Sequence, residues 1–480
     1  MEKRYCMGNN KTGRIFAILT GVFFFWGFVA ASNGILIPVF KEHLKLSQGE
    51  SQLIAFAFYV AYTIGSLIYF SMVRFFKFDV VRDWGYGKGI AIGLFISAIG
   101  TLLFIPAANN ASFPLVLGGL MIVGIGFAFQ QTAANPLAIL LGPSKTGSQR
   151  LSMAGGINNL GTTIGPLLVS YAIFGSLGQE ETVLDITAVK IPYLALGALF
   201  FLFGVIFWRM EDPLKDQAEE ENDSEDSAIS VSHTKKSALA FPQLIMGMFG
   251  IFVYVGVEVA TADNLPEYLK QELGVATNQV APFVSMYWAS LMVGRWTSAA
   301  SAFNISDKAK SLLRILLPFV AFGIFLGANS IAGVDVSPFL PYAALIGGLI
   351  VFDYLSMGNP ARQLLIYSVI GILLLITGMY TEGKVAMFSL LGVGLFCSTL
   401  WPCIFTLSIK GLGKHTGQGS SFLVMMIMGG GIVSLTQGAF SELAQIGIRY
   451  SFWVGVICFT YLATFAYMAP KFFKQQGIED

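Results

Sequence analysis

Long, uninterrupted apolar windows are the feature that most constrains the fold of this chain. Windows such as Ile15 to Ile37 and Gly89 to Ala108 are apolar on all sides, not on one helical stripe. They reach the roughly 18 residues that a bilayer-spanning helix needs. Only 12% of the 480 residues are charged, against roughly a quarter in an average soluble domain. The sequence therefore predicts an all-α membrane protein with many spans.

Polar connections divide the apolar sequence into fourteen windows, which predict fourteen membrane helices. They cover residues 15–40, 51–73, 88–107, 114–141, 150–174, 191–208, 243–266, 280–303, 311–332, 338–357, 363–380, 384–409, 419–440 and 450–469. The first window follows several basic residues, as in a signal peptide. It continues to about Phe40 and many spans follow it, so we expect it to remain as the first helix.

The basic residues predict the orientation in the membrane. With the N-terminus inside, 22 of the 29 Lys and Arg residues fall in inner segments, six fall in outer segments, and Arg295 lies within a helix. Basic residues concentrate on the cytoplasmic side of membrane proteins. Both termini are therefore expected in the cytoplasm. The count does not distinguish fourteen helices from twelve, because removing a pair leaves the orientation unchanged.

One connection differs from the others. Residues 211–240 contain nine acidic residues and no aromatic residue, so they cannot bury a core. We interpret them as a flexible cytoplasmic linker between an N-terminal six-helix bundle, residues 1–210, and a C-terminal bundle, residues 241–480. The C-terminal bundle includes an extra helix pair at about residues 309–358.

The two parts contain similar landmarks. A Pro-containing helix segment, Thr132 to Pro136, precedes a Thr-Gly helix start at Thr146, and the segment Thr399 to Pro402 precedes another at Thr416. Such internal repeats indicate a duplicated bundle with its binding site between the halves at mid-membrane.

The sequence lacks the residues that several functional classes of protein require. The four cysteines show no Cys-x-x-Cys spacing and the three histidines lie in polar connections, so we expect no disulfide, no metal site and no cofactor. No phosphate-binding Gly-rich motif and no Ser, His and Asp set is recognisable, which leaves a membrane-embedded enzyme a remote alternative. A net charge of +1 provides no field for nucleic acid.

Five segments resemble the major facilitator superfamily, and more narrowly its fucose/glucose/galactose:cation symporter family, which includes the fucose permeases. They are Phe25-Trp26 through Asn33-Gly34-Ile-Leu-Ile-Pro38, Gln131-Thr-Ala-Ala-Asn135-Pro136, Arg150-Leu-Ser-Met-Ala through Asn158, Gly294-Arg295, and Ser408-Ile-Lys-Gly-Leu-Gly413 followed by Gly419-Ser-Ser-Phe-Leu-Val-Met425. The resemblance implies a major facilitator fold of two six-helix bundles. The windows 311–332 and 338–357 have no counterpart in a twelve-helix member. We interpret them as an inserted transmembrane hairpin between the eighth and ninth family helices.

The chain also departs from the fucose permeases at three positions. Those proteins carry an Asp in helix 1 and a Glu in helix 4 for proton coupling, where this chain has Gly34 and Gln131. Gly155 replaces a glutamine of the family's site. These departures argue against fucose itself as the substrate and against the fucose-permease proton route.

A sugar site requires amides or carboxylates for hydroxyl groups and an aromatic plane for the ring face. By the resemblance, Asn158 matches a substrate-contacting asparagine of the fucose permeases and Trp401 matches a family aromatic residue. The substrate-binding candidates are Asn33, Gln131, Asn135, Asn158, Trp401, Trp26, Tyr287 and Trp288. The alternative for each is structural, because amides also join membrane helices and aromatic residues fill cores.

Glu258 is an acid inside an apolar window. Such a group costs about 2.5–3.5 kcal/mol at the centre of a membrane helix and often marks an ion path. Asp263 and Asn264 follow it, and we expect all three to take part in cation coupling. Glu258 and Asp263 lie about 140° apart on a straight helix, so they share a site only if the helix unwinds near Pro266.

The remaining intramembrane charges have less specific interpretations. Asp353 is expected to meet Arg362 or water, and Arg295 and Arg150 to make gate or loop contacts.

Taken with the resemblance, these features predict a secondary active transporter of the inner membrane that imports a hexose or small glycan by cation symport. Sodium is favoured over a proton as the cation. The alternatives are an uncoupled facilitator and a transporter of another small solute. We expect a monomer in contact with lipid.

Overall fold

The computed structural model describes residues 10–43, 48–110, 112–174, 190–211, 237–276, 280–302 and 305–478. Side chains are described for these residues except 10, 11, 31–43, 48–56, 144 and 166–174. Most of the predicted acidic linker, residues 212–236, lies outside the described residues.

Helices account for all the regular structure in the described part of the chain, which contains no strand. The first half consists of α1 (Asn10–His43), α2 (Gln48–Phe75), α3 (Val80–Trp84), α4 (Tyr86–Leu102), α5 (Phe104–Asn109), α6 (Phe113–Leu140), α7 (Gly147–Phe174) and α8 (Lys190–Arg209). The second half consists of α11 (Pro242–Gln271), α12 (Ala281–Ala299), α13 (Asp307–Ile331), α14 (Ala343–Ser356), α15 (Pro360–Tyr380), α16 (Gly383–Cys397), α17 (Leu400–Ile409), α18 (Thr416–Met425), α19 (Gly429–Ser441), α20 (Gly447–Ser451) and α21 (Trp453–Gln475).

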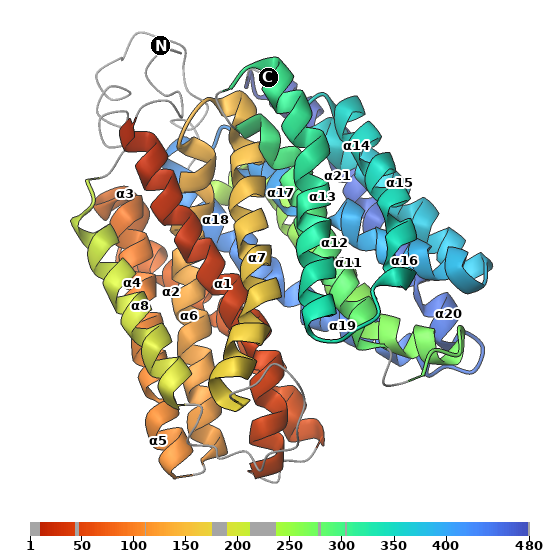
Figure 1. Cartoon of the computed structure of the whole chain (residues 1–480). Coiled ribbons are helices and arrows are strands. Elements are labelled where there is room, and N and C mark those ends of the chain that lie inside the picture. The colour runs from red at the N-terminus through yellow and green to blue at the C-terminus, as the bar shows by residue number, and fades with distance from the viewer. Residues whose placement is uncertain are drawn as a thin grey trace.

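Each of the fourteen predicted windows contains a helix. Among the described residues, twelve helical stretches are long and apolar enough to cross a membrane. The remaining two windows contain α7 and α12. Figure 1 shows that α1 begins and α21 ends at the same end of the molecule. We call this end the terminal face and the other end the opposite face.

The two halves have the same helix packing. In the first half, α1 packs along α7, and α4 packs against both α6 and α8. In the second half, α11 packs along α19, and α15 packs against both α16 and α21. This correspondence leaves α13 and α14 without a counterpart. The fold is therefore two six-helix bundles with one inserted helix pair, which confirms the predicted fold class.

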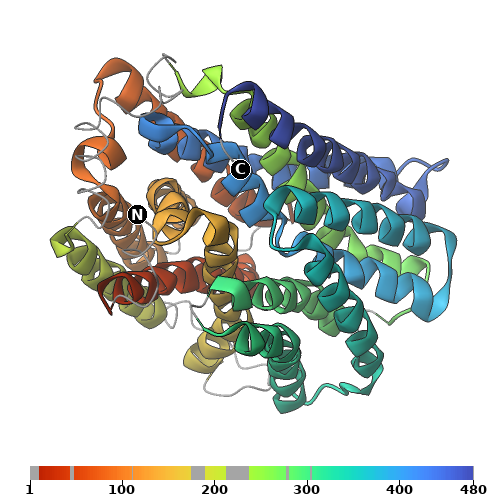
Figure 2. The ribbon, with the colours of Figure 1, turned by 90° about the horizontal axis from the view of Figure 1, so that it is seen from above.

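The inserted pair lies at the edge of the second bundle, as the view from above shows (Figure 2). Helix α13 packs on α12, and α14 packs on α12, α15 and α16. The fully buried Tyr342, just before α14, anchors the inserted pair to the second bundle. The Tyr342 hydroxyl lies 2.6 Å from Ser290 Oγ and donates to Leu391 O over 3.0 Å. One edge of the pair is thus fixed by polar bonds, while apolar side chains such as Leu316 and Val320 remain exposed for lipid.

Glycine permits the closest helix contact in the first bundle. A Cβ at Gly27 on α1 would lie 1.9 Å from Asn158 O on α7, and a Cβ at Gly161 would lie 2.4 Å from Phe24 O. Small residues allow membrane helices to approach with their backbones nearly in contact. The close approach of α1 and α7 places the Asn158 amide of α7 within hydrogen-bond distance of Phe23 O on α1.

The halves contact each other near the terminal face. Ser421 Oγ on α18 donates to Ser66 O on α2 over 3.2 Å. Close by, a Cβ at Gly417 would lie 3.0 Å from the hydroxyl of Tyr69 and 3.1 Å from Asp79 Oδ1. Helix α18 packs on both α2 and α6. The terminal-face ends of the two bundles are therefore closed against each other in this conformation.

Candidate functional site

Three predicted amides of the first half have different surroundings. Gln131 Nε2 donates to the hydroxyl of Tyr62 on α2 over 3.1 Å. Asn158 Nδ2 donates to Phe23 O on α1 over 2.9 Å, and its side chain is partly exposed. Asn135 is buried, and its Nδ2 has no hydrogen-bond partner. The fourth predicted amide, Asn33, lies on α1, but its side chain is outside the described residues.

Trp26 belongs to a buried network. Its indole Nε1 donates to Gln130 Oε1 over 2.8 Å, and Gln130 Nε2 donates to Ser97 Oγ over 2.9 Å. Trp26 is only 5% exposed and Gln130 is fully buried. The network joins α1, α6 and α4, so the polar atom of Trp26 is engaged in helix packing.

Arg295 of α12 connects the two halves. Arg295 of α12 donates through Nη1 to Gly155 O over 3.1 Å and to Asn159 Oδ1 over 3.0 Å, both on α7. Its Nε donates to Ser398 O over 2.8 Å in the second half. A Cβ at Gly155 would lie 3.0 Å from Nη1 of the same arginine. The glycine therefore provides the space into which Arg295 extends.

Glu258 lies on the inner side of α11 among aromatic residues. Its carboxylate accepts a hydrogen bond from the hydroxyl of Tyr254, one turn earlier on the same helix. The rings of Tyr254 and Trp401 are 6.3 Å apart between centroids. The second half thus brings an acid and two aromatic rings together.

Tyr287 and Trp288 occupy positions next to this group. Tyr287 is fully buried, and its hydroxyl donates to the backbone carbonyl of Glu258 over 2.9 Å. Trp288 is half-buried and meets the Tyr287 ring edge to face, with centroids 5.8 Å apart. Tyr287 therefore fixes the backbone that carries Glu258.

Helix α11 corrects one expectation about cation coupling. It is continuous from Pro242 to Gln271, with Pro266 inside it, and does not unwind between Glu258 and Asp263. The exposed Asp263 accepts a 2.6 Å hydrogen bond from Ser434 on α19. Asn264 is buried and donates to Ala260 O over 2.8 Å within its own helix. The expected broken-helix carbonyls are absent from this described segment.

Tyrosines complete the site, and the sequence analysis did not select them. Tyr59 and Tyr62 lie on α2 of the first half, and the Tyr59 ring lies against Gly430 of α19. The sequence could have identified Tyr254 as a partner of Glu258, because it lies four residues earlier on the same helical face. Tyr62 had no such signal, because its contact with Gln131 joins two separate helices.

Metal binding receives no support from the described residues, in which no group of three or more His, Cys, Asp or Glu side chains converges. Cys397, Cys403 and Cys458 are free and buried.

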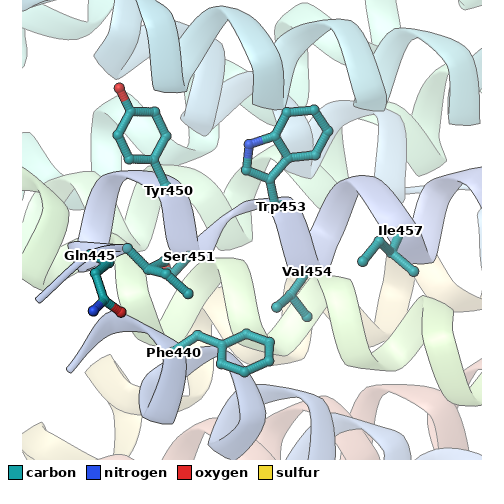
Figure 3. A pocket seen from close by; sticks show the side chains of 8 residues that line it. Phe440, Gln445, Tyr450, Ser451, Trp453, Val454 and Ile457 are labelled. Atoms are coloured by element: carbon teal, nitrogen blue, oxygen red, sulfur yellow. The ribbon is translucent and has the colours of Figure 1, made fainter. Parts of the chain in front are cut away.

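An apolar cavity of about 220 Å³ lies between the ends of α19, α20 and α21 toward the opposite face. Figure 3 shows that aromatic and aliphatic side chains dominate its lining, including Phe440, Tyr450, Trp453 and Ile457. It contains none of the predicted site residues. A sugar needs more polar partners than this lining offers. The site of interest is therefore the set of residues Arg295, Asn159, Glu258, Tyr254 and Trp401, which we call the central group.

Comparison with known proteins agrees with this geometry. The profile of the Major Facilitator Superfamily matches residues 18–361. A glucose/galactose transporter of Brucella abortus is 33% identical over 456 residues, covering 94% of this chain and 93% of that protein. The L-fucose-proton symporter of Escherichia coli is 27% identical over 467 residues, covering 94% and 92%. The crystal structure of the superfamily transporter FucP in the outward conformation is 25% identical, with a TM-score of 0.70 and coverage of 96% and 99%.

Proposed function

Because this chain belongs to the major facilitator superfamily, within the fucose/glucose/galactose symporter family that its motifs indicated, we propose that it carries a hexose or small glycan by cation symport. The family consists of transporters, so the chain is a transporter and not an enzyme. The proposed mechanism is alternating access, in which the two bundles rock about a central site.

The observation that carries this proposal is the central group that both bundles build. Arg295 and Asn159 meet across the bundle interface, and Glu258, Tyr254 and Trp401 gather on α11 and α17 of the second half. Sugars need donors, acceptors and an aromatic plane in one place. A site shared by both halves can be exposed to either side as they move.

We assign the substrate contacts in two groups. Gln131, Asn158 and Trp401, with Asn33 on α1, are retained as direct contacts. Trp26, Asn135, Tyr287 and Trp288 are assigned a supporting role, since Trp26 and Tyr287 use their polar atoms in internal hydrogen bonds.

The coupling site is assigned to Glu258. The expectation of sodium depended on an unwound α11 that would offer carbonyl ligands, and this helix is continuous. A proton needs only the carboxylate, so proton coupling fits the geometry better. The related Escherichia coli protein is a proton symporter. Asp263 and Asn264 then have secondary roles.

We further propose that the terminal face is cytoplasmic and that the membrane is the inner membrane. The excess of basic residues in the connections at this face supports the orientation. Closure of the terminal face then corresponds to an outward-facing state, the state of the FucP crystal structure. Residues 1–210 and 241–480 form the halves, residues 211–240 form the linker, and the protein acts as a monomer in lipid.

Reconstituted protein tests the function directly. Proteoliposomes should accumulate one member of a panel of labelled hexoses under a proton gradient, and a sodium gradient alone should not drive accumulation. Glu258→Gln should abolish accumulation but retain sugar exchange, because the site keeps its shape and loses its titratable group. Glu267→Gln, an exposed position on the same helix, is the matched control and should behave like the parent.

The other outcomes are equally informative. Full accumulation by Glu258→Gln would remove this residue from coupling. Sodium-driven accumulation would restore the sodium scheme. Equal uptake without any gradient would identify a facilitator, and no uptake of any sugar would contradict the substrate class.

A further inference from the structure

The inserted helix pair contains a buried acid with specific partners. Asp353, near the terminal-face end of α14, is 3% exposed. Its Oδ2 lies 3.7 Å from Arg314 Nε on α13, and its Oδ1 accepts a 3.1 Å hydrogen bond from Gln363 Nε2 on α15. The partners are thus Arg314 and Gln363, where the sequence suggested Arg362 or water. A buried acid is costly unless it is paired, so this position is held from two sides.

The same contacts continue toward the first bundle. Gln363 Oε1 accepts a bond from Cys403 Sγ of α17 at 3.5 Å, and Cys403 Sγ lies 3.7 Å from Ser148 Oγ on α7. Next to Ser148, Gln149 Nε2 donates to Gly358 O over 2.9 Å. Gly358 belongs to the turn between α14 and α15.

Two connections therefore reach α7 from the inserted pair. The first runs through the side chains of Asp353, Gln363 and Cys403, and the second runs through the α14–α15 turn. Gln149, Gln363 and Cys403 are all buried. Both connections end where the two halves close against each other at the terminal face. Any opening of that face that separates α7 from α17 must break them.

We propose that the inserted pair is a brace for the gate at the terminal face. It holds the α14–α15 turn and Gln363 in position, and these bind the start of α7. The brace stabilises the state that is closed at this face and open toward the opposite face. A twelve-helix bundle without the pair lacks Asp353, Arg314 and the Gly358 turn, so the device is specific to the insertion. The proposal does not depend on which substrate the protein carries.

Cys403 is a built-in reporter of gate opening, because it lies fully buried between the halves. Replacing Cys6, Cys397 and Cys458 by Ala leaves it as the single thiol, and its alkylation by N-ethylmaleimide in proteoliposomes measures opening. Gln149→Ala removes one bond across the gate and should raise the labelling rate by about 2- to 10-fold. Asp353→Asn weakens the pairing with Arg314 and should raise it in the same direction.

Two controls match these changes. Gln271→Ala alters an exposed glutamine that bonds within its own helix, and Asp335→Asn alters an exposed acid at the far end of the inserted pair. Both should label at the parent rate. Melting temperatures separate gate opening from loss of fold, and Gln149→Ala decides alone if Asp353→Asn does not fold. A rate for folded Gln149→Ala that equals or falls below the parent rate would overturn the proposal.

Discussion

Arg295 of α12 donates a 3.0 Å hydrogen bond to the side-chain oxygen of Asn159 on α7, which joins the two halves of the protein. The same guanidinium group binds Ser398 O in its own half. Breaking either contact leaves a charge in a region with few other acceptors, which is costly in a membrane. Arg295 therefore has to find new partners when the halves move, and a bound sugar can provide them.

Replacing this arginine tests that role. Arg295→Lys keeps the charge but loses the planar fork that reaches α7 and the α16–α17 junction together. We expect sugar binding to weaken at least about tenfold, since hydrogen bonds to charged groups contribute about 1.5–3 kcal/mol each. Equilibrium binding of labelled sugar to purified protein measures the loss. Arg449→Lys, at an arginine paired with Glu272 far from the site, should retain parental affinity. Parental affinity in Arg295→Lys would exclude the arginine from the site.

The close contact between Gly155 and Arg295 leads to a related prediction. An added methyl group would lie 3.0 Å from Arg295 Nη1 and 3.2 Å from its Cδ, so Gly155→Ala should displace the guanidinium from α7. Uptake should fall several-fold while the protein remains folded, because the group displaced is the end of a flexible side chain. Gly118→Ala on α6 adds the same methyl group where no atom lies within 4 Å. If both variants transport equally, close contact at Gly155 has no functional importance.

Much of the fold could be predicted from the sequence because each membrane helix is a continuous apolar segment, which local hydrophobicity identifies. All fourteen windows contain helices, and the repeated Pro and Thr-Gly landmarks lie in corresponding helices, α6 and α7 in one half and α17 and α18 in the other. The position of the inserted pair followed from the same pattern. These predictions needed no information about which helix touches which.

The site was harder because its chemistry depends on helix rotation and on contacts between distant segments. Trp26 was selected as an aromatic residue near Asn33, yet its indole faces Gln130, 104 positions away. Arg295 was expected to make gate or loop contacts, and the sequence could not show that its partners Gly155 and Asn159 lie in the other bundle. The unwinding near Pro266 that a shared site for Glu258 and Asp263 required does not occur, because the missing proline donor is tolerated within a continuous α11.

Asn158 has both a structural and a proposed binding role, which one variant can separate. Asn158→Ala removes the 2.9 Å bond to Phe23 O and should lower stability by about 0.6–1.5 kcal/mol, the range for membrane and soluble hydrogen bonds. We also expect sugar binding to be lost at concentrations that saturate the parent. Asn329→Ala is the matched control, since Asn329 Nδ2 donates to Phe325 O over 3.0 Å within α13. Reduced stability with unchanged affinity would leave Asn158 a structural residue.

The topology of the inserted pair can be tested at its turn. Asp335 lies in the exposed turn between α13 and α14 and accepts a 3.0 Å bond from the backbone N–H of Ser337. If α13 and α14 both cross the bilayer, this turn is at the opposite face, which we assign to the outside. A single cysteine at Asp335→Cys should then react with a membrane-impermeant maleimide added to intact cells. Asp307→Cys, at the exposed start of α13, should react only after the membrane is opened. Labelling of Asp335→Cys from the inside alone would mean that the pair does not span the membrane as the fold requires.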